Sequence, residues 1–190
     1  MSIKSIISTL ALAALLQGCV AAAVVGVVGG ASVATDNRSL GNQIDDQKIE
    51  LDAHANIANS EALKNNTNLH VVSVNGSVLV VGQAPNSYLR DQAIKAINDV
   101  NGVNQLHNQI RVSNTTSFTT KTNDVWLTSK VKAALFGNEE LDSSNIKVVT
   151  ENGEVFLMGL ITKAQAAIAV DIARNVGGVN RVFKIFEYLK

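Results

Sequence analysis

LHVVSVNGSVLVVG, residues 69–82, decides the fold of this 190-residue chain. An Asn-Gly pair stands between two runs of apolar and β-branched residues. Because Asn-Gly tolerates positive φ at both central positions of a type I′ turn, the stretch predicts a β-hairpin. Residues 146–159 repeat the pattern as IKVVTENGEVFLMG, at an offset of 77. Two hairpins of one design indicate an internal repeat.

The repeat continues beyond the hairpins. AINDVNGVNQL, residues 96–106, matches IARNVGGVNRV, residues 172–182, at an offset of 76. Each copy therefore reads helix, strand, strand, helix, strand. Two helices on one face of a three-stranded mixed sheet give an α+β unit. Gly82 and Gly159 are expected to close the second strands. The other expected elements are opening helices over Asp45–Ala58 and Asn123–Phe136, second helices over Ser87–Val100 and Lys163–Val176, and last strands over Asn104–Val112 and Asn180–Leu189.

The N-terminus has the pattern of a secretory signal. A positive start at residues 1–4 precedes the apolar run IISTLALAALL and then Gln17-Gly18-Cys19. LLQGC resembles a bacterial lipobox, in which the cysteine is acylated and begins the mature chain. Val20 follows Cys19 in place of the aspartate that commonly retains lipoproteins in the inner membrane. The alternative is an uncleaved membrane helix, because residues 6–34 are long enough to span a bilayer.

The repeated motifs resemble the BON domain family. VNGSVLVVG with NGVNQLHNQI, and ENGEVFLMG with GGVNRVFKIF, each meet the pattern of that family. The resemblance implies a signal peptide at 1–18, a lipidated N-terminus and linker at 19–44, BON domains at 45–112 and 123–190, and a linker at 113–122.

For a lipoprotein with two BON domains, the resemblance also implies a function. The expected protein is not an enzyme, is anchored in the outer membrane and faces the periplasm. It binds anionic phospholipid, such as phosphatidylglycerol or cardiolipin, through its second domain. It supports outer-membrane integrity and concentrates at division sites. The outer-membrane protein assembly machinery is the protein partner to consider, and an adaptor role toward such a protein is the alternative function.

Composition narrows the choice of partner. Lys and Arg number 16 against 16 Asp and Glu, so nucleic acid is not expected as a partner. The single cysteine excludes an internal disulfide. His54, His70 and His107 are too scattered for a local ligand motif, so we expect no metal, no cofactor and no catalytic set. The acidic pair Asp45-Asp46 is explained as a helix cap, as is the pair Thr122-Asn123 in the second copy.

The stretch DVWLTSKVKAALF, residues 124–136, contains the only tryptophan. On a helical wheel, the apolar stripe lies along Leu127, Val131, Ala134 and Leu135. Trp126 and Phe136 lie off that stripe, across the small residues Ser129 and Ala133, with Lys130 and Lys132 at the rims. Aromatic and lysine side chains on one face are typical of a helix that lies in a membrane interface.

The first copy serves as an internal control for that interpretation. At an offset of 78, Lys48 stands in place of Trp126, and Ala58 stands in place of Phe136. Residues 45–60 carry four acids against Lys48, a net charge of −3, whereas residues 121–137 carry three lysines against Asp124, a net charge of +2. Only the second copy suits an anionic membrane. Two alternatives remain, packing of the aromatics against the first domain and binding of a separate protein.

Overall fold

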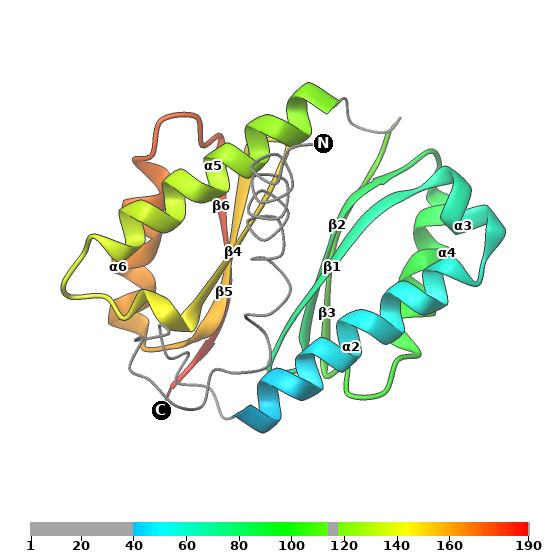
Figure 1. The fold of residues 1–190 in the computed structure, drawn as a ribbon, viewed down its shortest axis with the longest axis horizontal. Helices are drawn as coiled ribbons and strands as arrows, with labels where there is room; N and C mark the ends of the chain where they lie inside the picture. Colours follow the sequence, from blue (N-terminus) through cyan, green and yellow to red (C-terminus); the bar gives the residue numbers. More distant parts are fainter. Residues whose placement is uncertain (1–39, 114–117, 190) are drawn as a thin grey trace, which may run out of the picture. The chain divides into compact units, whose positions relative to one another are not determined.

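The computed structural model describes residues 40–113 and 118–189, and Figure 1 shows their elements in chain order. Domain 1 contains α2 (Leu40–Ala58), α3 (Glu61–Asn66), β1 (Asn68–Val74), β2 (Ser77–Ala84), α4 (Ser87–Asn98) and β3 (Gln105–Val112). Domain 2 contains α5 (Phe118–Phe136), the 3-10 turn η2 (Ser143–Asn145), β4 (Ile146–Glu151), β5 (Glu154–Ile161), α6 (Lys163–Arg174) and β6 (Arg181–Tyr188).

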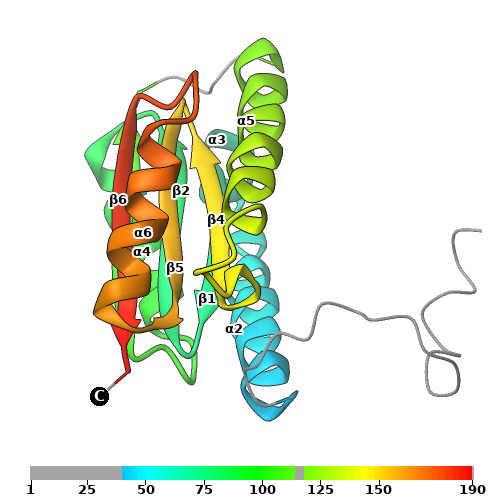
Figure 2. The same cartoon turned by 90° about the vertical axis from the view of Figure 1, so that its left-hand side faces the viewer.

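Each domain is built on a three-stranded mixed sheet, in the orders β1-β2-β3 and β4-β5-β6. The hairpin strands pair antiparallel, and the third strand pairs parallel to the second. A parallel pair needs a crossover connection, which α4 and α6 supply. Figure 2 shows α5 and α6 side by side on one face of the second sheet. The α+β fold class expected from the sequence is confirmed.

Both hairpins close through the type I′ turns that the Asn-Gly pairs predicted. Asn75 and Gly76 have φ of 55° and 75°, and Asn152 and Gly153 have φ of 53° and 72°. Gly82 has a different role from the one expected. Strand β2 continues past it to Ala84, and a Cβ at Gly82 would lie 2.0 Å from the carbonyl oxygen of Asn68. Glycine is required there because the neighbouring strand approaches too closely for a side chain.

A buried aspartate from each opening helix holds the adjacent turn. The two carboxylate oxygens of Asp46 accept hydrogen bonds from the backbone N–H groups of Asn75 (2.7 Å) and Gly76 (3.0 Å). Asp124 accepts from Asn152 and Gly153, each at 2.8 Å. The sequence interpretation of Asp46 as an N-cap is therefore wrong. The residue lies inside α2, where its carboxylate satisfies turn N–H groups that would otherwise be buried without partners.

Both opening helices begin earlier than the sequence pattern indicated. Helix α2 begins at Leu40 and α5 at Phe118, so α5 extends into the stretch that was expected to be a linker. Residues 118–122 contain neither glycine nor proline, and nothing in them stops a helix. The short helix α3 was not expected. Ser60 caps its N-terminus, with its side chain accepting from the N–H of Leu63, which is buried in the first core.

Each helical layer and its sheet enclose a separate apolar core. Ile49, Ala53 and Ile57 of α2 are buried in the first core. Val131 and Leu135 of α5 are buried in the second. A third buried cluster combines side chains from the opposite faces of the two sheets. Its members are Val72, Val74, Leu79, Val81, Val149, Phe156, Met158 and Ile185.

Polar contacts accompany this third cluster. Arg111 of β3 pairs with Glu154 of β5 at 2.5 Å, and Lys147 of β4 pairs with Glu50 of α2 at 2.8 Å. The two domains accordingly belong to one compact unit. Within residues 40–113 and 118–189, no helix combines the length and apolarity needed to cross a bilayer.

Candidate functional site

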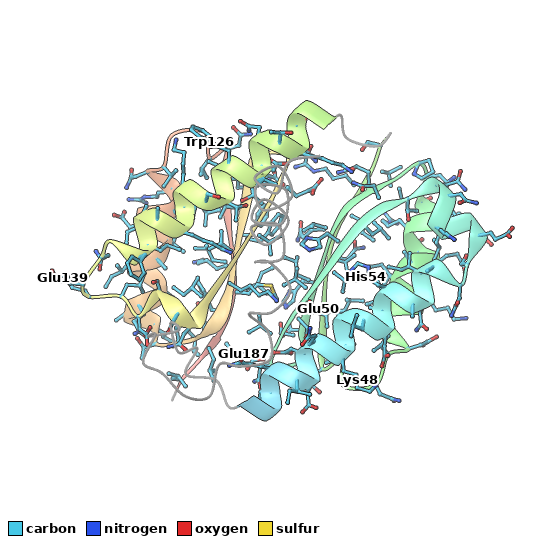
Figure 3. The ribbon with its side chains drawn as sticks, viewed as in Figure 1. Lys48, Glu50, His54, Trp126, Glu139 and Glu187 are labelled. Atoms are coloured by element: carbon cyan, nitrogen blue, oxygen red, sulfur yellow. The ribbon has the colours of Figure 1, made fainter. Side chains whose placement is uncertain are left out.

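Helix α5 has a buried face and an exposed face, as the helical wheel predicted. Leu127, Val131 and Leu135 are at most 1% exposed. Trp126 is 58% exposed and Phe136 is 79% exposed, although both are large and apolar. Figure 3 shows Trp126 on the side of α5 that points away from the sheet. Neither aromatic is buried against domain 1, so the interdomain alternative does not describe this structure.

The membrane-facing candidates form one continuous strip along α5, which we call the α5 outer face. Ser129, Lys132 and Ala133 are exposed between the two aromatics or beside them. Val125 also belongs to this face and is 69% exposed. The sequence interpretation missed Val125. Its place on the wheel, about 20° from Phe136, was the signal that could have found it.

Lys130 is less free than the sequence suggested. Its ammonium group lies over the Trp126 ring, 4.3 Å from the ring centroid, and donates a hydrogen bond of 2.7 Å to the carbonyl of Gly177. The lysine therefore joins α5 to the loop before β6 and fixes the position of the indole. Both of its contacts are to uncharged groups, so its positive charge is not neutralised. Lys130 therefore keeps a net attraction for anions near Trp126.

Lys132 stands at the opposite rim of the α5 outer face. It lines a hollow of about 450 Å³ together with Lys121, Val125 and Thr128 of the same helix and residues of β1 and β4. Lys121 donates to the side chain of Asn68 at 2.9 Å. Among the described residues, Lys132 has no carboxylate partner. Glu50, Asp124 and Glu151 line the same hollow, but none of them forms an ion pair with Lys132. Within the part of the chain that the structure describes, the α5 outer face thus has a lysine without an ion-pair partner at each rim and mostly apolar side chains between them.

The corresponding surface of domain 1 has a different character. Lys48 occupies the position of Trp126 and forms an ion pair with Asp52 one turn later. Figure 3 shows Lys48 on the outer side of α2. Ile44 and Leu51 are also exposed on α2, and neither residue was predicted to lie on its outer surface. They are aliphatic and stand near Asp45 and Lys48, so α2 offers no aromatic pair and no surplus of positive charge.

The described residues offer little evidence for a metal site or for a ligand site near the first turn. No group of three or more His, Cys, Asp or Glu side chains within them is placed to hold a metal. A hollow of about 410 Å³ near the first turn is lined by Asn42, Asp45, Lys48, Asn75 and Asn104, among others. The neighbouring Asp46 carboxylate is already used by the turn. Cys19, the expected lipidation site, lies outside the described residues.

Comparison with known proteins assigns the family. The BON domain model matches residues 45–114 and 123–187. The chain belongs to the BON domain family and contains two copies of the domain.

Three relatives resemble the chain over most of its length. It is 42% identical to the outer membrane lipoprotein DolP of Haemophilus influenzae, over 92% of this chain and 90% of that protein. It is 38% identical to a 21 kDa hemolysin of Actinobacillus pleuropneumoniae, over 82% and 80%. It is 29% identical to the osmotically-inducible protein Y of Escherichia coli, over 80% and 77%. The resemblance to the BON domain family that the repeated motifs indicated is thereby confirmed, and none of these names describes an enzyme.

Proposed function

We propose that this BON protein is an outer-membrane lipoprotein that binds anionic phospholipid through the α5 outer face. The observation that carries the proposal is the exposure of Trp126 and Phe136 on a helix whose counterpart in domain 1 has Lys48 and Ala58 at the same positions. Exposed large aromatics are costly in water and favourable in the headgroup region of a bilayer. The similarity to a named outer membrane lipoprotein supports the location.

In the proposed complex, α5 lies in the plane of the interface. Trp126, Val125 and Phe136 enter the headgroup region across the small residues Ser129 and Ala133. Burial of each aromatic contributes about 1.5–3 kcal/mol. Lys130 and Lys132 meet lipid phosphates, each contributing about 1 kcal/mol near an anionic surface. The gain is modest for a free protein, but it becomes effective when an anchor raises the local concentration.

The anchor in this proposal is the acylated Cys19. One acyl chain gives only marginal membrane binding, whereas a lipoprotein cysteine typically carries three. Loss of residues 1–18 and addition of acyl mass, measured on the membrane-extracted protein, test this part. A mature chain that retains residues 1–18 contradicts it. By similarity, the protein would face the periplasm, support outer-membrane integrity and gather at division sites.

The lipid proposal is tested by Trp126→Glu in a soluble form of the protein that lacks the anchor. The substitution places a negative charge where lipid phosphates repel it, so co-sedimentation with phosphatidylglycerol or cardiolipin vesicles should be lost. Thermal melting should change little, because Trp126 is outside the core. Lys48→Glu is the matched control and should leave vesicle binding nearly intact. Binding should also weaken with salt, since charges are screened over about 10 Å at 0.1 M.

An adaptor role is the second candidate, because an exposed aromatic pair also suits a protein partner. If Trp126→Glu binds vesicles as well as the parent does, the lipid role of α5 is wrong. A photo-crosslinker at position 126 in cells then separates the two cases. Crosslinks to one envelope protein, such as a component of the outer-membrane protein assembly machinery, would support the adaptor.

A further inference from the structure

A second feature distinguishes domain 2 from domain 1, and it lies away from the α5 outer face. Helix α6 and the edge strand β6 border a hollow of about 300 Å³. We call it the α6–β6 groove. Three cations line it, Lys163 and Arg174 from α6 and Lys184 from β6. Ala166 and Ala167 provide a small apolar floor, and Tyr188, 44% exposed, stands at its rim.

The geometry of β6 explains why these side chains share one groove. Val182 and Phe186 pack into the core beneath the helices, whereas Phe183 and Ile185 belong to the cluster on the other face of the sheet. Side chains alternate between the two faces of a strand. The side chains of Lys184 and Tyr188 therefore project on the same side as α6.

The charges of the groove are poorly compensated. Asp171 is its one acidic residue, and it pairs with Arg174 at 2.5 Å in an exposed i,i+3 contact. Within residues 40–113 and 118–189, neither Lys163 nor Lys184 has a carboxylate partner. Exposed pairs of this kind stabilise little, so Arg174 remains available to a ligand. The groove therefore attracts anions.

Domain 1 contains the same scaffold without these cations. Helices α4 and α6 have twelve residues each and align at an offset of 76, and β3 and β6 pair with their neighbours in the same register. Ser87, Asn98 and Asn108 stand where domain 2 has Lys163, Arg174 and Lys184. The remaining charges of α4 are Lys95 and an Arg90–Asp91 pair at 2.8 Å. The fold therefore does not require the three cations.

The edge of β6 adds a second kind of binding group. Strand β6 is hydrogen-bonded to β5 only, and no third strand lies beyond it among the described residues. Such an edge presents backbone N–H and C=O groups that another extended chain can pair with. Because Lys184 and Tyr188 lie on this edge strand, a ligand that pairs with β6 also passes the groove.

We propose that the α6–β6 groove binds an extended acidic segment of a partner protein, which adds a strand to the free edge of β6. Lys163 and Arg174 are eleven residues apart on α6, which corresponds to about 16 Å along the helix. Five extended residues span a similar length and direct three alternate side chains to one face. A segment with acids at alternate positions thus matches the three cations while its backbone pairs with β6.

A peptide fits these features better than a membrane surface does. A bilayer contacts protruding side chains, as on the α5 outer face, whereas the α6–β6 groove is a hollow with a line of cations. It has no tryptophan or phenylalanine at its rim to enter the headgroup region. Lipid phosphates would use the cations but would leave the backbone groups of β6 unpaired. The proposal is thus independent of the lipid-binding role of α5.

The test uses the full chain in a nonionic detergent and a fluorescein-labelled peptide of alternating Thr and Glu. Fluorescence anisotropy should show saturable binding that weakens as salt is added. The triple variant K163S/R174N/K184N, which carries the domain 1 residues, should bind the peptide at least about tenfold more weakly. Replacing Lys64, Arg90 and Lys95 of domain 1 with Asn removes three cations elsewhere and should leave binding within about twofold. Equal binding by the triple variant would overturn the proposal.

Two further arms test the mode of binding on the unaltered chain, so they remain decisive even if the triple variant folds poorly. A peptide of the same composition with its acids in one block should bind more weakly, as should an alternating peptide N-methylated at alternate residues. Equal binding of either peptide contradicts strand addition. The triple variant should also still co-sediment with phosphatidylglycerol vesicles. Loss of vesicle binding, with no binding of the peptide to the parent, would make the groove a lipid site instead.

Discussion

Helices α2 and α5 occupy equivalent places in the two domains, have 19 residues each, and bury the same positions of the repeat. Ile49, Ala53 and Ile57 of α2 correspond to Leu127, Val131 and Leu135 of α5, and all six are buried. The outward positions differ in both size and charge. A duplicated domain must keep the residues that face its core, whereas its outer face is free to change. The second copy has used that freedom to expose two aromatics.

The largest loss of stability is expected at the core positions of α2 and α5, where the two domains are alike. Leu127→Glu places a carboxylate in the core of domain 2 and should unfold that domain, at a cost above about 4 kcal/mol. Ile49→Glu should do the same to domain 1. Thermal melting and native-state hydrogen exchange would measure both. A folded Leu127→Glu variant would mean that α5 does not depend on this face for its packing.

The next largest loss of stability is expected at the buried aspartates of the two opening helices. Asp124→Asn removes one of two charged acceptors from the turn N–H groups and should cost about 1.5–3 kcal/mol. Asp46→Asn should cost at least as much, because Asp46 also accepts from the hydroxyl of Ser73 at 2.7 Å. Urea unfolding of each variant measures the difference. Asp45→Asn, at the exposed neighbouring position, is the control. An equal loss of stability there would argue against the role of the buried carboxylates in holding the turns.

A swap of outer faces tests the functional side of the comparison. The variant W126K/F136A gives α5 the residues of α2 and should lower the affinity for phosphatidylglycerol vesicles by about tenfold or more. The variant K48W/A58F gives α2 the aromatics. Its affinity for the vesicles should exceed that of the parent by no more than about threefold, because residues 45–60 still contain several acidic side chains. Strong binding through the altered α2 would show that aromatics suffice without positive charge.

These comparisons also show what the sequence could and could not predict. The Asn-Gly turns, the repeat and the outward position of Trp126 follow from local patterns, so they could be predicted. The contact of Lys130 with the carbonyl of Gly177 joins segments 47 residues apart, and no local pattern indicates it. The roles of Asp46 and Asp124 were missed for the same reason, although their recurrence at an offset of 78 was a visible signal.

One pattern in the sequence does predict that the two sheets pack together. Residues 78–81, VLVV, form a continuous apolar run instead of alternating with polar residues. Such a run indicates a strand that is buried on both faces. The helices cover only one face, so the other face needs a cover as well. Val78 and Val80 lie in the first core, whereas Leu79 and Val81 lie in the cluster shared by the two sheets.

The smallest predicted effect concerns a position of the repeat where the domains differ inside this shared region. Glu151 is the residue before the Asn-Gly turn of domain 2, and Val74 holds the same position in domain 1. The carboxylate of Glu151 accepts a hydrogen bond from the side-chain amide of Gln83. Burial raises the pKa of Glu151, and the hydrogen bond from Gln83 offsets part of that rise. Protonation is therefore easier in the folded state than in the unfolded state.

The sign of the pH dependence follows from that shift. Below the ordinary pKa of a glutamate, Glu151 is protonated in both states, and its full contribution to stability is present. As pH rises from there through the raised pKa, the unfolded state loses its proton first, so the free energy of unfolding falls. Glu151→Gln removes this titration. Relative to the parent, the variant should gain stability as pH is raised from about pH 4 toward neutral pH. Urea melts across that range measure the gain, with the exposed Glu139→Gln as control, and a constant difference would contradict the burial of this carboxylate.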